Sequence, residues 1–98
     1  MTRPVRILRR AEKDLLEIHR YIERDAPDAA ERFLGKLLDG IEQLGSISIG
    51  VAPRDESLRS RGFRVLVGGE YLIFYKEFAR HVRVYRVLHG KRKYSHLI

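Results

Sequence analysis

The sequence predicts an α+β domain in which a hairpin of two helices covers one face of a mostly antiparallel sheet. Apolar residues recur every three or four positions over residues 11–44, which is the period of amphipathic helices. Strand-like runs separated by turn signals follow over residues 63–88, and a short strand-like stretch precedes the helices. Because helices and strands fall into separate stretches, the pattern is typical of an α+β fold. We expect residues 1–98 to form a single domain.

The first predicted elements are a short strand and a helix. Val5 and Ile7 indicate the strand, with Pro4 at its start or edge. The period then changes, and the buried stripe of a helix is predicted at Ala11, Leu15, Ile18 and Ile22. We expect the solvent-facing side of this helix to carry Glu12, Lys13, Asp14, Glu17 and Arg20.

A second helix is predicted after an interruption at residues 24–27. Pro27 suits the first turn, where its missing N–H costs nothing, and Asp25 or Ala26 would sit at the cap. Asp28 and Glu31 place negative charge near the positive end of the helix dipole. Gly45 is expected to end this helix. The apolar stripe consists of Ala30, Phe33 or Leu34, Leu37, Ile41 and Leu44.

A loop, a three-stranded antiparallel meander and a short basic tail are predicted for the remainder. The turn residues Gly50, Pro53 and Asp55 indicate a loop over residues 46–56. The strands are predicted at residues 63–67, 71–75 and 81–88, and Gly68-Gly69 is a hairpin signal between the first two. The run at 71–75 is apolar at both parities, so we expect a central strand buried on both faces. The sheet face away from the helices is expected to be open.

Charge is distributed unevenly along the chain. Residues 1–50 hold nine Lys/Arg and nine Asp/Glu, whereas residues 51–98 hold eleven Lys/Arg and four Asp/Glu, so the net charge of +7 lies in the second half. A basic half suits nucleic acid, a membrane surface or an acidic protein, or it is a solvated face without a partner. The chain has no cysteine, which fits a reducing cytoplasm. No apolar run has the length of a signal peptide or a membrane span.

Five segments in order resemble a known protein family. They are DLLEIHRYI at residues 14–22, PDAA at 27–30, LR at 58–59, YLIFY at 71–75 and RVLHG at 86–90. Together they cover nearly the whole chain and resemble the RelE/ParE superfamily, the toxins of type II toxin–antitoxin systems that are often described as plasmid stabilisation proteins. The resemblance implies the same α+β fold.

The resemblance also implies one of two activities. RelE-like members are ribonucleases that cut mRNA on the ribosome, whereas ParE-like members poison DNA gyrase and need no catalytic site of their own. The ribonuclease members place basic side chains where cleavage develops charge on a phosphate. Here Leu72 stands where RelE-like members carry Arg, and Leu66 replaces one of two alternate lysines, the other position being Arg64. Leucine cannot neutralise a phosphate, so the ParE branch is favoured.

The histidines and Arg86 are the remaining candidates for a functional site. We expect no metal and no cofactor, because no helical i, i+4 metal pair occurs among His19, His81, His89 and His96. His89 ends the last strand, either as a functional residue or as a strand-end hydrogen-bonding group. Arg86 lies an even number of positions from Val82, Val84 and Leu88, so in a regular strand its charged side chain would share the face of these three apolar residues. It indicates a β-bulge, a buried ion pair or a contact to an acidic partner.

We therefore expect a growth-inhibiting toxin that acts on DNA gyrase or a similar topoisomerase, is neutralised by a ParD-like antitoxin, and meets DNA only through that antitoxin. The alternatives are a ribosome-dependent mRNA endonuclease, with Arg64, Arg86, His89, Arg92 and Tyr94 as its reduced active site, or an inactive relative that only binds antitoxin. The resemblance and the basic charge together nominate a target- or antitoxin-binding set: Arg59, Arg61, Arg64, Arg83, Arg86, His89, Lys91, Arg92, Lys93 and Tyr94.

Overall fold

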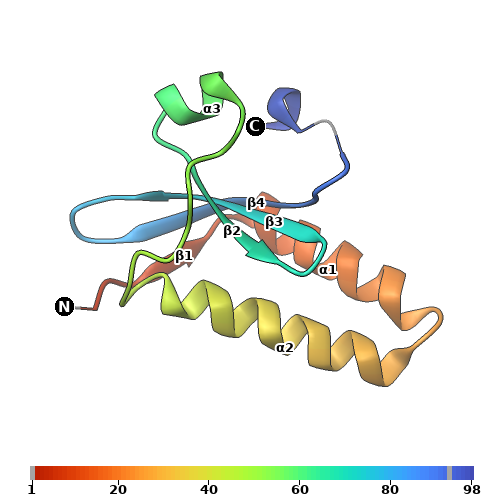
Figure 1. Cartoon of the computed structure of the whole chain (residues 1–98). Helices are drawn as coiled ribbons and strands as arrows, with labels where there is room; N and C mark the ends of the chain where they lie inside the picture. Colours follow the sequence, from red (N-terminus) through yellow and green to blue (C-terminus); the bar gives the residue numbers. More distant parts are fainter. Residues whose placement is uncertain (1, 93) are drawn as a thin grey trace.

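The computed structural model describes residues 2–92 and 94–98 and has the predicted α+β architecture (Figure 1). The elements in chain order are β1 (Val5–Ile7), α1 (Arg9–Glu23), α2 (Pro27–Gln43), α3 (Glu56–Ser60), β2 (Arg64–Gly68), β3 (Tyr71–Glu77), β4 (Val82–His89) and the 3-10 helix η1 (Ser95–Leu97). The predicted strands and both long helices are confirmed within one or two residues of their expected ends.

One sheet of four strands runs through the molecule in the order β1-β4-β3-β2. β1 pairs with β4 in parallel, and the other neighbours are antiparallel. The interior position of β3 confirms the expectation from its apolar run, because Ile73, Phe74 and Tyr75 are all buried. The hairpin between β2 and β3 turns at Gly69, whose φ of 60° is the left-handed conformation that glycine adopts without steric cost.

The helical hairpin covers one face of the sheet and forms the larger core (Figure 1). The predicted stripes meet the inward-facing residues of β3 and β4, and the buried members are Ala11, Leu15, Ile18, Leu37, Ile41, Leu44, Ile73, Tyr75, Val82, Val84 and Val87. Pro27 is the first residue of α2 and Ala26, not Asp25, is its cap. Gly45 lies beyond the end of α2, where a Cβ would clash with the Arg3 carbonyl oxygen, so the glycine permits the close approach of the N-terminal segment.

The opposite face is covered over part of its area, whereas the sequence led us to expect an open face. α3 and the C-terminal segment lie over it (Figure 1). They enclose a second, smaller core of Leu58, Phe63, Val65, Phe74 and Leu88, against which Tyr85, Tyr94, Leu97 and Ile98 pack. The predicted loop over residues 46–56 ends at the first residue of α3. The sequence did not reveal this helix, because five residues are too few to show a helical period. The Asp55 side chain caps it, accepting a hydrogen bond of 2.9 Å from the Leu58 N–H.

A bulge in β4 changes which face its residues meet. Phe74 pairs with Arg86, but the next residue of β3, Tyr75, pairs with Val84, so Tyr85 is the extra residue. Val82 and Val84 before the bulge, and Val87 after it, all face the helices. The register shift that the parity of Arg86 indicated is therefore confirmed.

Arg86, next to this bulge, forms a buried ion pair with Asp14 of α1. Its Nε donates to Asp14 Oδ2 at 2.7 Å and its Nη2 donates to Oδ1 at 3.1 Å, a two-pronged geometry. The Val87 N–H donates to the same Oδ2 at 3.0 Å, and Arg86 Nη1 donates to the Leu97 carbonyl at 2.8 Å. The expectation that Asp14 faces solvent was wrong, because Asp14 is 4% exposed and Arg86 is 5% exposed. One pair thus joins α1, β4 and the C-terminal segment.

Replacing Asp14 with Ala should lower the free energy of unfolding by about 3–5 kcal/mol, because it leaves the buried Arg86 charge without its partner. Urea unfolding of the variant measures this loss. Glu17→Ala is the matched control, since Glu17 is an exposed acid on the same helix and should change stability by less than about 0.5 kcal/mol. Equal effects of the two substitutions would contradict the role assigned to the pair.

Candidate partner-binding surfaces

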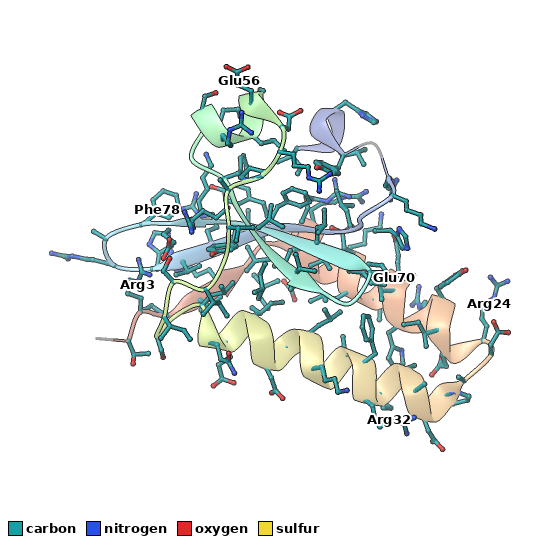
Figure 2. All side chains as sticks on the ribbon, viewed as in Figure 1. Arg3, Arg24, Arg32, Glu56, Glu70 and Phe78 are labelled. Atoms are coloured by element: carbon teal, nitrogen blue, oxygen red, sulfur yellow. The ribbon has the colours of Figure 1, made fainter. Side chains whose placement is uncertain are left out.

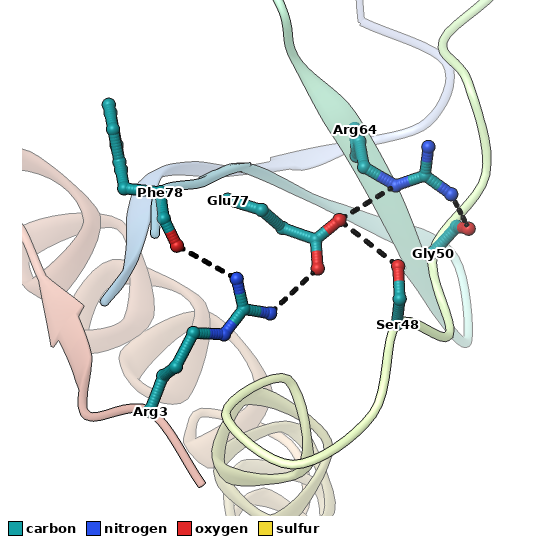
Figure 3. Close-up of polar contacts among 6 residues, drawn as sticks. All are labelled: Arg3, Ser48, Gly50, Arg64, Glu77 and Phe78. Atoms are coloured by element: carbon teal, nitrogen blue, oxygen red, sulfur yellow. Dashed lines mark hydrogen bonds and ion pairs between the residues drawn. The ribbon is translucent and has the colours of Figure 1, made fainter. Parts of the chain in front are cut away.

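Arg64 belongs to a polar network on the helix side of the sheet, around Glu77 of β3 (Figure 3). Its Nη2 donates to the Gly50 carbonyl, and its Nε lies 3.4 Å from Glu77 Oε1. Arg3 Nη2 donates to Glu77 Oε2 at 2.9 Å, and the Ser48 hydroxyl donates to Oε1 at 3.0 Å. Arg64 therefore anchors the loop after α2 to β2 and β3.

The network lowers the pKa of Glu77. Burial acts the other way and would raise it, but hydrogen bonds from Arg3 and Ser48, with the charges of Arg3 and Arg64, outweigh burial. A carboxyl with a lowered pKa in the folded state stabilises the fold above its unfolded pKa. That contribution is lost as the pH falls through the folded value.

His89 and Arg92 lie in a different place, a cleft of about 450 Å³ beside α1 at the far end of β3 and β4. Tyr71 and Glu70 line the same cleft. His89 Nε2 lies 3.6 Å from Glu70 Oε2, and the His89 ring meets the Tyr71 ring edge-on with centroids 5.3 Å apart. The pKa of Tyr71 is raised mainly because its side chain is partly buried, and the nearby Tyr21 and Glu70 raise it further. The cleft carries acids as well as bases and is not a purely cationic site.

Tyr94 lies on the other side of the sheet, where its ring packs 4.9 Å from that of Phe74. It lines an apolar groove of about 430 Å³ together with Leu72, Val51 and Val67. Leu72 thus leaves this surface apolar where the ribonuclease relatives carry Arg. Leu66 faces the helices and packs against the larger core, so it takes no part in this groove.

The five residues of the alternative ribonuclease site do not converge. Arg64 pairs in register with Tyr75, whereas His89 pairs with Tyr71, four positions away along β3. This separation is about 13 Å at the rise of an extended strand. Arg86 is committed to Asp14, which leaves His89 and Arg92 as the two members that share a cleft.

The remaining candidate cations have local partners or lie apart. Arg59 Nη1 donates to the Pro53 and Arg54 carbonyls, at 2.9 and 2.6 Å, and holds the loop against α3. Arg61 Nη2 donates to the Ile98 carbonyl at 3.1 Å. Lys91 is exposed, and its backbone N–H donates to His89 Nδ1 at 3.1 Å. Lys93 lies outside the described residues, and Arg83 belongs to the aromatic side of the sheet described below.

Exposed apolar side chains form two surfaces that the sequence did not single out. Leu16 and Leu38, 50% and 40% exposed, flank a groove of about 420 Å³ between α1 and α2. Val51 and Val67, 58% and 61% exposed, lie at the edge formed by β2. An excess of apolar residues in the sequence could have indicated both surfaces. Each helix has one Leu beside its buried stripe, and β2 has apolar residues on both faces although it is an edge strand.

The outer edge of β2 is only partly paired. Val51 already bridges to Val65 through two backbone hydrogen bonds of 2.8 Å. Because outward and inward backbone groups alternate along an antiparallel strand, the N–H and C=O of Val67 also point away from β3. Among the described residues, no backbone hydrogen bond outside the regular elements involves Val67. The edge is therefore covered by the loop at Val65 and available at Val67.

Among the described residues, no cluster of three or more metal-ligating side chains occurs, and no helix has the length and apolarity of a membrane span. The arrangement supplies two apolar surfaces and one mixed cleft, and exposed apolar surfaces of this kind are candidate interaction sites.

Glu77→Gln should reduce stability at neutral pH and leave it unchanged in acid, because protonation removes the same charge from the wild-type protein. Urea unfolding at neutral pH and well below pH 4.5, the usual pKa of a Glu carboxyl, should show the two proteins converging as the pH falls. Glu42→Gln, at an exposed position on α2, is the control and should not change the pH dependence. A constant difference between wild type and Glu77→Gln at both pH values would contradict the network's role.

Comparison with known proteins supports the fold and identifies the family. A model of the ParE toxin of the type II toxin–antitoxin system parDE matches residues 5–94. A chain of the chromosomal ParDE system from P. aeruginosa superposes with a TM-score of 0.75 at 15% identity, covering 90% of this chain and 96% of that one. A chain of the toxin–antitoxin complex RelBE2 from Mycobacterium tuberculosis gives a TM-score of 0.67 at 20% identity, covering 91% and 92%. The curated proteins compared give no match. With the family model matching nearly its whole length, this chain belongs to the ParE toxin family of type II toxin–antitoxin systems.

Proposed function

We propose that this ParE-family chain inhibits bacterial growth by poisoning DNA gyrase and that a ParD-like antitoxin neutralises it. The observation that carries the choice of target is the dispersal of the ribonuclease candidates. Arg64 of β2 and His89 of β4 pair with residues of β3 that are four positions apart, and Arg86 is buried in an ion pair. Leu72 and Leu66 replace two further cations. A site that must stabilise the charge developing on a phosphate needs these groups in one place.

Expression of the chain alone should arrest growth, and the purified protein should inhibit supercoiling by gyrase or trap its cleavage complexes. It should leave mRNA on translating ribosomes intact. Both assays use the same preparation, so inactive protein is recognised by failure in both. Ribosome-dependent mRNA cleavage with gyrase unaffected would instead support the endonuclease. Normal growth at confirmed soluble expression would support the inactive relative.

The antitoxin is proposed to add a strand to the edge of β2 and to bury apolar side chains on Val51 and Val67. Backbone groups of an incoming extended segment would pair with the outward N–H and C=O of Val67, and its side chains would occupy the groove beside Leu72 and Tyr94. The bridge between Val51 and Val65 supports this mode, because one short segment already pairs with the same edge. Such a partner is ordered only when bound.

Val67→Lys should weaken antitoxin binding by about tenfold or more, because lysine on an edge strand opposes the addition of another strand. Val67→Thr, which keeps a β-branched side chain without charge, is the matched control and should retain most of the affinity. Titration calorimetry with the antitoxin encoded beside this gene measures both. Unchanged affinity of Val67→Lys would remove the β2 edge from the interface and leave the groove between α1 and α2 as the alternative surface.

A further inference from the structure

Three cations form a row across the sheet on the face away from the long helices. Arg6 of β1 pairs in register with Arg83 of β4, and Arg83 pairs with Lys76 of β3. Their neighbours Val5, Ile7, Val82, Val84 and Tyr75 pack toward the helices, so the three alternate side chains share the other face. Adjacent strands lie about 4.8 Å apart, so the backbone positions of these three cations fall side by side over about 10 Å.

The row is not neutralised within the described part of the chain. None of the three cations forms an ion pair there, and the nearest acid along β3, Glu77, is directed to the opposite face and paired with Arg3 and Arg64. Like charges directly opposite on neighbouring strands destabilise a sheet. Partial burial and the positive charges of Arg6 and Arg83 lower the pKa of neighbouring His81, which is the expected effect of uncompensated positive charge.

Aromatic rings hold two of these cations, Lys76 and Arg83, in place without removing their charge. Lys76 Nζ lies 4.6 Å from the Phe63 ring centroid and 5.5 Å from that of Tyr85. The Arg83 guanidinium lies 4.8 Å from the centroid of the Phe78 ring, and the His81 ring stacks on Phe78 with centroids 4.7 Å apart. Cation–π contacts fix the position of a charge and leave it able to attract an anion. Two of the three charges in the row are therefore held in place, and the third, Arg6, is exposed on the neighbouring strand.

We propose that this row, Arg6, Arg83 and Lys76, binds the phosphate backbone of duplex DNA directly and without sequence preference. The inference goes beyond the proposed function, does not depend on the gyrase target, and adds a direct contact to the indirect one expected from the family resemblance. Duplex DNA presents about one negative charge per 1.7 Å of helix axis, a density that suits three cations spaced within about 10 Å. Backbone contacts of this kind position a protein on DNA without reading its sequence.

Two other polyanions fit the same surface less well. Single-stranded nucleic acid is bound by aromatic faces on which bases stack, and here the rings of Phe63, Phe78 and Tyr85 are already occupied by cations and by one another. An acidic protein segment would need apolar anchors, and the exposed large apolar residues are on the helices, at the β2 edge and in the loop after α2. The basic row and the proposed antitoxin edge are separate surfaces.

The test is fluorescence anisotropy of a short labelled DNA duplex of mixed sequence with the full chain at several salt concentrations. The row variant carries Arg6→Gln, Lys76→Gln and Arg83→Gln. The control carries Arg24→Gln, Arg32→Gln and Lys36→Gln, which removes the same charge from exposed positions on the helical hairpin. Arg24 and Arg32 lie at the other end of the molecule from Phe78 (Figure 2). The row variant should bind at least about tenfold more weakly at low salt and reduce the slope of log K against log salt by about 2–3, while the control should stay close to wild type.

The row variant should remain folded, because removing like charges relieves repulsion; thermal unfolding checks this. Arg6→Gln alone, at an exposed position of the edge strand β1, is a second variant and should reduce the slope by about 0.9. Equal losses in the row and control variants would show attraction by net charge alone and overturn the proposal. Tighter binding of the single strand, or an equal row-dependent affinity for poly-glutamate, would overturn the choice of duplex DNA.

Discussion

The buried pair between Asp14 and Arg86 holds the two layers of this protein together. Residues 72 positions apart in the sequence meet through a bulge in β4 that directs Arg86 toward α1 and toward the Leu97 carbonyl. A charge in the interior is tolerated only with a partner and satisfied hydrogen bonds, and here the Val87 N–H completes the acceptor side. The pair consequently links the helical hairpin, the central strands and the C-terminal segment, which the two apolar cores also pack together.

This pair buries Arg86, and the other candidate residues lie apart from one another on the surface. The C-terminal segment, held against the sheet by Arg86, helps to cover the face that would otherwise be open and carries Tyr94 into the apolar groove beside β2. His89 and Arg92 remain in a mixed cleft beside α1, and Arg64 is held at the other end of β3 by Glu77 and Gly50. A chain arranged in this way offers several recognition surfaces and does not assemble the proposed set of ribonuclease residues.

The sequence was informative where a pattern is local and periodic. The stripes of α1 and α2 follow the helical period, the apolar run of β3 marks a strand buried on both faces, and Gly68-Gly69 marks the hairpin. The parity of Arg86 was out of step with its neighbours, and this irregularity correctly indicated a bulge or a buried pair. It could not name Asp14 as the partner, because Asp14 sits beside the buried stripe of α1 and has the charge of a surface residue.

The α+β class, the order of the elements and the family resemblance were thus determined by the sequence alone, because they depend on short-range periodicity and on motif order. Which residues meet was decided only by the tertiary structure. The alignment of Arg6, Arg83 and Lys76 requires β1, β4 and β3 to lie side by side in one register. The burial of Asp14 and the covering of part of the second sheet face by α3 and the C-terminal segment depend on other contacts between residues far apart in the chain. Strand register joins residues far apart in the chain, and no local pattern specifies the partner across a strand.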